Sequence, residues 1–361
     1  MTVVALAIFA YAFGVSLILC AIARRVAPRF GLVDKPDARK AHKAPTPLGG
    51  GVAIWLAVGV VLLSGAIAIR YGRAYFAPSV AVYAEGAWTR AGELAILFGL
   101  ASAIMVLGLL DDKYQLGPML RLGVQVALAV LFVLTADQLT MFQAGGLATK
   151  IVMGTITVLW IVGLTNSFNF LDNMDGLAAS VGLIAALLFA AAQVAVGSLF
   201  VPAVLLALAG SLGGFLIHNR PPARLFMGDA GSNFLGFLLG TLTVAGTFTG
   251  AGYSSFGVLA PLLIMAVPLY DTTSVVLIRI REGRSPFQAD RRHLSHRLVD
   301  RGLTPARAVA TIDLITLASG LGALLLSRLT TTYEAGVVVG QTLCLIGVVA
   351  ALEISTPPKS P

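Results

Sequence analysis

The stretch GLAASVGLIAALLFAAAQVAVGSLFVPAVLLALAGSLGGFLIHN, residues 176–219, decides the fold class of this chain. It contains no Asp, Glu, Lys or Arg over 44 residues. A helix needs about 20 apolar residues to cross a bilayer, so this stretch is long enough for two spans. We divide it near Gly197 and Ser198, and it therefore predicts a pair of membrane-spanning helices.

The rest of the chain has the same character. Its 361 residues are 57% hydrophobic and only 12% charged, with a mean hydropathy of +0.89. Soluble domains carry about 25% charged residues, which excludes an ordinary soluble globule. We expect an all-α, polytopic integral membrane protein with a single domain over residues 1–361. The pattern predicts eleven transmembrane helices, over residues 3–23, 49–69, 93–110, 120–137, 150–168, 176–195, 199–218, 230–249, 256–278, 305–327 and 335–353.

The basic residues indicate the orientation. The formal charge is +8, and 20 of the 25 Lys and Arg fall on one side of the predicted spans. Positive charge collects in cytoplasmic loops, so we expect the N-terminus outside and the C-terminus inside. A nucleic-acid partner is excluded because no segment is long enough for a soluble domain with a basic face. The aspartates of the loops and all four histidines lie at the cytoplasmic side, which predicts one polar site at that membrane boundary.

Asp111 and Asp112 end the third predicted helix. Carboxylates are unfavourable at a helix C-terminus, which carries partial negative charge, and two adjacent ones also repel each other. A bound cation or a basic partner would compensate them. The alternative is a solvated helix end with Lys113 as the counter-charge.

A second acidic segment, NFLDNMDG at residues 169–176, joins the fifth and sixth predicted helices. Asn169, Asp172 and Asp175 are spaced by three, so they would share one face if the segment were helical. A helix cap would explain Asp175 alone, but not four Asn and Asp in seven residues.

Asp229 lies in FMGDAGS, residues 226–232, at the start of the eighth predicted helix. A helix N-terminus offers free N–H groups to phosphates, and a carboxylate suits Mg²⁺. The alternative is a capped helix start with small residues for packing.

Two further cytoplasmic loops carry candidate residues. The last loop, residues 279–304, holds His293 and His296 among arginines, and Arg and protonated His suit phosphate oxygens. A basic juxtamembrane run is also explained by topology alone. Asp271 lies within the ninth helix, where a functional role and a hydrogen bond between helices are equally good explanations. In the first loop, Lys43 and Thr46 could face the site or serve the backbone.

Together these motifs resemble the polyprenyl-phosphate N-acetylhexosamine-1-phosphate transferases, glycosyltransferase family 4. This family includes the WecA and TagO type of bacterial enzyme, the peptidoglycan translocase MraY and the dolichol-phosphate GlcNAc-1-phosphate transferase. The ordered motifs run from residue 31 to residue 297, with the helices at 305–353 peripheral. The resemblance implies Mg²⁺-dependent transfer of a sugar-1-phosphate from a UDP-sugar to a lipid phosphate, with release of UMP. Mn²⁺ is an alternative ion.

The resemblance also implies roles for individual residues. Asp229 and Asn169 are the expected metal ligands. Arg121 stands where many relatives carry Lys. Ser295 replaces the middle histidine of the family pattern, and the loop resembles the GlcNAc branch more than the three-histidine peptidoglycan branch. The remaining catalytic candidates are Asp111, Asp112, Asp172, Asp175, His293 and His296, and the substrate-binding candidates are Lys43, Thr46, Arg121, Asn219, Phe226, Arg281, Arg284 and Arg291.

The expected partners are a UDP-N-acetylhexosamine, most simply UDP-GlcNAc, a polyprenyl phosphate and the membrane, and the expected location is the inner (plasma) membrane. A homodimer is left open. We favour direct attack by the lipid phosphate, with a covalent aspartyl-phosphate as the alternative. The rival functions are a phospho-MurNAc-pentapeptide transferase and, more distantly, an ion-coupled transporter or lipid flippase. Transporters usually place their sites near the membrane midplane, and often within inverted repeats.

Overall fold

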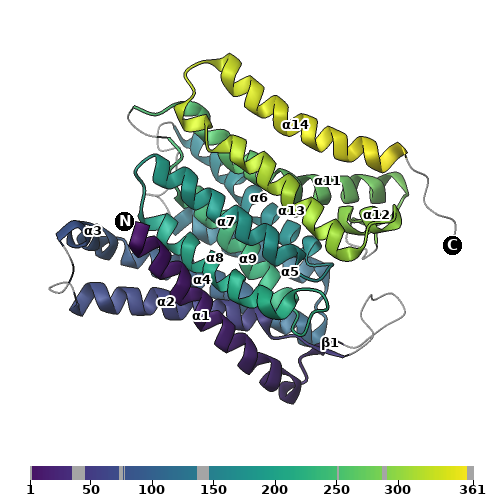
Figure 1. Ribbon diagram of the computed structural model, residues 1–361, viewed down its shortest axis with the longest axis horizontal. Helices are drawn as coiled ribbons and strands as arrows, with labels where there is room; N and C mark the ends of the chain where they lie inside the picture. Colours follow the sequence, from purple (N-terminus) through teal and green to yellow (C-terminus); the bar gives the residue numbers. More distant parts are fainter. Residues whose placement is uncertain are drawn as a thin grey trace.

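Each of the eleven segments expected to be helical is helical in the computed structural model (Figure 1). The structure describes residues 2–34, 45–72, 76, 78–135, 146–249, 252–286 and 291–355. The helices that correspond to the predicted spans are α1 (Thr2–Val26), α2 (Gly50–Tyr71), α4 (Ala91–Tyr114), α5 (Pro118–Thr135), α6 (Leu147–Leu171), α7 (Leu177–Ala195), α8 (Phe200–Asn219), α9 (Gly228–Ala245), α10 (Ala260–Ile264) with α11 (Ala266–Arg281), α13 (Pro305–Ala323) and α14 (Thr332–Ser355).

The prediction of an all-α, multi-pass membrane protein is confirmed. Within the described residues, nine helices are long and apolar enough to cross a membrane, and ten if the bent pair of α10 and α11 is one span. The helix α9 is not among them. It is a helix of 18 residues that begins with Gly228 and carries Asp229, Ser232 and Asn233 in its first turns.

Helix α9 lies at the centre of the bundle, in contact with α2, α4, α6, α7 and α8. Glycines let their backbones meet. A Cβ on Gly108 of α4 would collide with the Asp229 carbonyl oxygen, and one on Gly51 of α2 would collide with the Gly231 backbone. These contacts bring the end of α4 directly against the start of α9.

The ninth predicted span is broken. A 3₁₀ turn, η3 (Ser255–Leu259), leads into α10, and α11 follows at an angle of 58° after a break at Met265. Pro268 has no N–H to donate to the Ile264 carbonyl, which explains the break at this place.

Two short helices and a pair of short strands in the connecting loops were not predicted. They are a helix at the same end of the bundle as the N-terminus, α3 (Pro78–Thr89), a helix in the loop after α11, α12 (Leu294–Asp300), and an antiparallel pair, β1 (Val33–Asp34) with β2 (Thr46–Pro47). A parallel bridge between Leu48 and Phe226 joins this pair to the segment before α9. The first loop is thereby attached to the start of the central helix.

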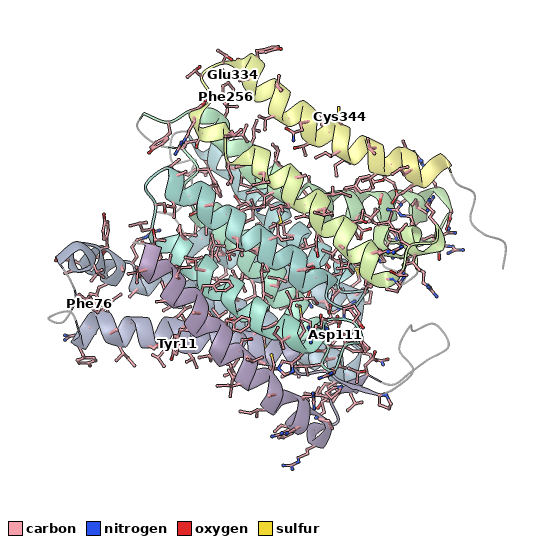
Figure 2. The ribbon with its side chains drawn as sticks, viewed as in Figure 1. Tyr11, Phe76, Asp111, Phe256, Glu334 and Cys344 are labelled. Atoms are coloured by element: carbon pink, nitrogen blue, oxygen red, sulfur yellow. The ribbon has the colours of Figure 1, made fainter. Side chains whose placement is uncertain are left out.

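The polar loops lie at one end of the bundle. In Figure 1, β1 and α12 lie at the right end, whereas the N-terminus and α3 lie at the left. Figure 2 places Asp111 at the end with β1 and α12, and Phe76 at the opposite end. This agrees with the predicted division of the loops between the two sides.

A labelling experiment tests the orientation. With Cys344 replaced by Ser, a Ser285→Cys variant should react with an impermeant thiol reagent only from the cytoplasmic side, because most basic residues share that side. Ser255→Cys is the matched control at the other end, since both serines are exposed. Ser255→Cys should react only from outside. Reaction of Ser285→Cys from outside would invert the topology.

Candidate active site

The two carboxylates at the end of α4 are both compensated within the protein. Asp112 accepts hydrogen bonds from the backbone N–H groups of Asp229 and Ala230, at 2.8 and 3.1 Å. It therefore caps the N-terminus of α9, whose partial positive charge favours a carboxylate. Gly228 has a φ of +70°, and a Cβ there would collide with the Asp112 carboxylate. The expectation that these N–H groups are free for phosphates is wrong for Asp229 and Ala230, because Asp112 occupies them.

Asp111 and Asp229 share the cation Arg121. The Arg121 guanidinium donates to Asp111 Oδ2 and lies 3.2 Å from Asp229 Oδ2. Asp111 is buried, with 4% of its side chain exposed, whereas the Asp229 side chain is 34% exposed. Asp111 also accepts from the Leu116 N–H at 2.7 Å. Arg121 thus supplies the compensating positive charge that the sequence predicted for the acidic pair. Asp229 is more accessible to solvent than Asp111.

Asn169 comes to Asp229 from the last turn of α6. Its amide nitrogen donates to Asp229 Oδ1 at 2.7 Å and to the Ser232 hydroxyl at 3.1 Å. The structure therefore brings together the two residues predicted as metal ligands. Behind them, Asn233 donates to the Asp229 carbonyl at 2.8 Å.

The sequence reasoning missed the polar group that supports this arrangement. Asn166 donates to Gln125 at 2.7 Å, and Gln125 donates in turn to Asn233 at 3.3 Å. These side chains link α5, α6 and α9 beneath the site. Their signal was available, because an amide within an apolar span needs a partner in the membrane.

The segment between α6 and α7 is a turn. Helix α6 ends at Leu171, and Gly176 has a φ of +80° before α7 begins. The segment is not helical, so the condition under which Asp172 and Asp175 would share a face with Asn169 is not met. Asp175 accepts from the Ala223 N–H at 2.9 Å, which ties this turn to the segment after α8.

Asp172 is half-buried beside other carboxylates. Burial, with the nearby charges of Asp112 and Asp175, raises the pKa of its carboxyl from 3.8 to about 7. A carboxyl with this pKa changes charge near neutral pH.

This pKa makes stability depend on pH in a defined direction. The folded protein binds a proton at Asp172 near pH 7, whereas the unfolded chain binds it only near pH 4, so this contribution to stability falls as pH rises through 7. From pH 6 to pH 8 the loss is roughly 1 kcal/mol. Thermal unfolding with a chelator present should show a larger drop for wild type than for Asp172→Asn. An equal drop in both proteins would contradict the assigned pKa.

Several residues predicted to bind substrate take part in hydrogen bonds with the backbone of neighbouring loops. Asn219 is buried, accepts from the Gly176 N–H at 2.9 Å and donates to the Leu225 carbonyl at 2.9 Å. Phe226 bonds to Pro47 and Gly50 through its own backbone. Thr46 is buried in β2. Lys43 lies outside the described residues.

The last loop is anchored by Asp271. His293 is buried and lies with its Nδ1 2.9 Å from Asp271 Oδ2, while the Leu294 N–H donates to Asp271 Oδ1 at 2.6 Å. The hydrogen-bonded explanation of Asp271 is the one that the structure supports. Because the carboxylate accepts, Nδ1 carries the proton and Nε2 is left for other partners. The ring also meets Phe170 edge-on.

The other polar residues of this loop differ in exposure. Burial lowers the pKa of His296, and the charges of Arg291 and His293 lower it further, so the neutral imidazole is favoured. Ser295, in place of a family histidine, donates its hydroxyl to Asn173 and so joins α12 to the α6–α7 turn. The predicted substrate-binding arginines, Arg281, Arg284 and Arg291, are exposed. Arg284 lies 3.5 Å from Glu282.

The donor set near Asp229 suits a hard divalent cation. Among the described residues, no three His, Cys, Asp or Glu form a ready metal cage. Mg²⁺ usually takes only one or two carboxylates, with water and substrate phosphates completing its shell. The accessible Asp229 carboxylate meets that requirement, and Arg121 already holds positive charge against it. Asn169 turns its amide nitrogen to this carboxylate, so its oxygen becomes a ligand only after the amide rotates. The residues therefore fit the ion.

Comparison with known proteins agrees with these motifs. Residues 94–247 match the family described as glycosyl transferase family 4. The chain is 34% identical over 318 residues to a probable undecaprenyl-phosphate N-acetylglucosaminyl 1-phosphate transferase of Bacillus subtilis, covering 87% of this chain and 82% of the relative. It is 34% identical to the decaprenyl-phosphate N-acetylglucosaminephosphotransferase of Mycolicibacterium smegmatis (81% and 74% covered), and 29% identical to the undecaprenyl-phosphate alpha-N-acetylglucosaminyl 1-phosphate transferase of Yersinia pestis (87% and 81%). The family that the motifs predicted is thereby confirmed, and the chain belongs to glycosyl transferase family 4.

Proposed function

We propose that this protein transfers N-acetylhexosamine-1-phosphate, most simply GlcNAc-1-phosphate, from a UDP-sugar to a polyprenyl phosphate and releases UMP. The observation that carries the proposal is the cluster of Asp111, Asp112, Asn169 and Asp229 around Arg121 at one end of a membrane bundle. The names of the relatives support the lipid acceptor. In this proposal the reaction starts a lipid-linked envelope glycan, such as lipopolysaccharide or teichoic acid, at the inner membrane.

Asp229 and Asn169 would hold Mg²⁺ or Mn²⁺ in this reaction. When bound, the ion neutralises phosphate charge, which favours departure of UMP. Asp112 fixes the start of α9, so Asp229 stays in one place. Arg121 holds Asp111 and Asp229 at a constant separation. The side chains thereby fix the geometry before the substrates arrive.

Direct attack by the lipid phosphate accounts for the chemistry. A phosphate monoester has a second pKa near 6, so it is largely dianionic at neutral pH and needs no strong base. One of its oxygens bonds to the sugar-bearing phosphorus of the donor, and the bond from that phosphorus to the bridging oxygen breaks. Asp111 and Asp112 are less suited to covalent attack, because both already hold hydrogen-bond donors.

The donor would be recognised by the loops around the cluster. Asp172 and Asp175 lie in the turn beside it and would position nucleotide and sugar. His293 presents Nε2 because Asp271 fixes Nδ1, and His296 and the exposed arginines of the last loop would contact phosphate oxygens. Lateral approach of the lipid suits a site at the membrane boundary.

The deciding experiment measures UMP. Purified protein is incubated with UDP-GlcNAc, undecaprenyl phosphate and Mg²⁺, and UMP release is followed with and without each component. Release that requires both substrates and stops with a chelator supports the proposal. Release of UMP without lipid, or no release at all, would reject it. A transporter or flippase would release none.

The donor test separates the two branches of the family. We expect preference for UDP-GlcNAc over UDP-MurNAc-pentapeptide at matched concentration. Arg281→Ala or Arg284→Ala should weaken donor use by about 1–3 kcal/mol, the range for a lost charge-assisted hydrogen bond. Arg328→Ala, at the opposite end of the bundle, is the matched control. Preference for the muramyl donor would assign the chain to peptidoglycan synthesis and contradict this choice.

A further inference from the structure

The C-terminal helix α14 is held to the bundle by few apolar contacts. Its buried side chains are Ala335, Val338, Thr342 and Val349, while residues such as Leu343, Val348 and Leu352 are exposed. Apolar surface gives no hydrophobic driving force between helices in lipid, so polar contacts weigh more in placing this helix. Figure 1 shows the end of α14 beside α11 and α12.

At that end, α14 carries a buried carboxylate with two partners. Glu353, with 8% of its side chain exposed, lies with Oε1 3.2 Å from Arg297 Nε of α12, and its Oε2 accepts from the Tyr270 hydroxyl at 2.7 Å. Arg301, just after α12, donates to the Leu352 carbonyl at 3.1 Å. We call Tyr270, Arg297, Arg301 and Glu353 the α14 clamp. It joins the last helix to the loop that carries His293.

The clamp reaches His293 through one carboxylate. Arg297 donates to Ser274 at 2.8 Å and lies 3.9 Å from Asp271 Oδ1. Asp271, whose side chain is 1% exposed, holds the ring of His293 and the first N–H of α12. Two buried carboxylates, Glu353 and Asp271, therefore share the charge of Arg297.

We propose that Glu353 is a positioning residue for the donor site, acting through Arg297 on Asp271 and His293. The inference rests on the proposed function, in which His293 contacts the donor phosphates. Without Glu353, the nearest carboxylate to Arg297 among the described residues is Asp271. A stronger pairing of Arg297 with Asp271 competes with the hydrogen bonds to His293 and Leu294, so the start of α12 shifts and donor binding weakens.

Kinetics with both substrates varied test this inference. Glu353→Ala should raise the donor KM about tenfold, while kcat and the lipid KM change less than twofold. Loss of folded protein would instead lower kcat and leave both KM values unchanged. Glu353→Gln keeps an acceptor for Tyr270 but loses the charge, and should resemble Glu353→Ala. Glu353→Asp, which keeps the charge, should recover most of the donor KM.

The matched control lies on the same helix. Glu334 is exposed at the other end of α14 and accepts from the N–H groups of Thr330 and Thr331. Glu334→Ala should leave both KM values unchanged. Equal increases in the donor and lipid KM for Glu353→Ala, or no increase in either, would overturn the inference.

A readout without substrates separates this inference from the function. Trypsin cleavage after Arg292, adjacent to His293, should be several times faster in Glu353→Ala than in wild type, and unchanged in Glu334→Ala. If wild type releases no UMP but trypsin cleaves Glu353→Ala faster than wild type, the proposed function is rejected and the role of the α14 clamp in positioning His293 is supported. If wild type is active but neither cleavage nor the donor KM responds to Glu353→Ala, the clamp fails alone.

Discussion

Asp229→Asn should lower the rate of UMP release by about 100-fold or more, the scale of losing a major electrostatic element of a catalytic site. The variant keeps the shape of the side chain and an oxygen near Asn169, but it removes the charge that would hold a divalent cation against the donor. Asp229 is the most suitable carboxylate for this role because Asp111 is buried and Asp112 caps α9.

A second measurement distinguishes loss of metal binding from loss of folded protein in Asp229→Asn. Mg²⁺ should raise the unfolding temperature of wild type relative to a chelator, because a ligand that binds only the folded state stabilises it. Asp229→Asn should unfold cooperatively and show no such rise. Near-normal turnover by the folded variant would remove Asp229 from the mechanism.

Arg121→Met should lower the free energy of unfolding by about 1–3 kcal/mol when a chelator is present, the cost of leaving the buried Asp111 carboxylate without its partner. Asp111, 4% exposed, and Asp229 would then repel each other without the cation between them. Thermal unfolding in detergent measures the loss. Added Mg²⁺ should restore part of it, since a divalent cation supplies the same charge.

Arg121→Lys is the matched control for that change. It keeps the positive charge, although it loses the planar guanidinium that reaches both carboxylates. We expect most of the stability and activity to remain. An unfolding temperature of Arg121→Met equal to that of wild type would mean that Arg121 does not compensate the acidic cluster.

Most of the helical spans could be predicted from the sequence because length and hydropathy determine them. The exception is α9, which was predicted as a span although it is not apolar enough to cross a membrane by that measure. The gathering of Asp111, Asn169 and Asp229 at one end followed from the alternation of loops between two sides. The partner of Asp112 could not be predicted, because the cap at Asp229 lies 117 residues further along the chain. It depends on how closely α4 and α9 approach, which Gly108 permits.

The loops were less predictable than the spans. A spacing of three suggested that Asn169, Asp172 and Asp175 share a helix face, yet the helix ends at Leu171. The reason is tertiary, because Asn219 accepts from the Gly176 N–H and holds the turn. Helix α12 is seven residues long, too short for a periodic signal, and it is placed by Asp271.

The polar character of α9 has a consequence for how the protein is made. A segment that carries Asp229 in its first turn and is not apolar enough to cross on its own would partition poorly into lipid during synthesis. Its contacts α2, α4, α6, α7 and α8 all precede it in the chain, so they emerge from the ribosome first. We therefore expect α9 to insert by packing against helices that are already synthesised. Insertion of α9 and the geometry of its site then depend on the same neighbouring helices.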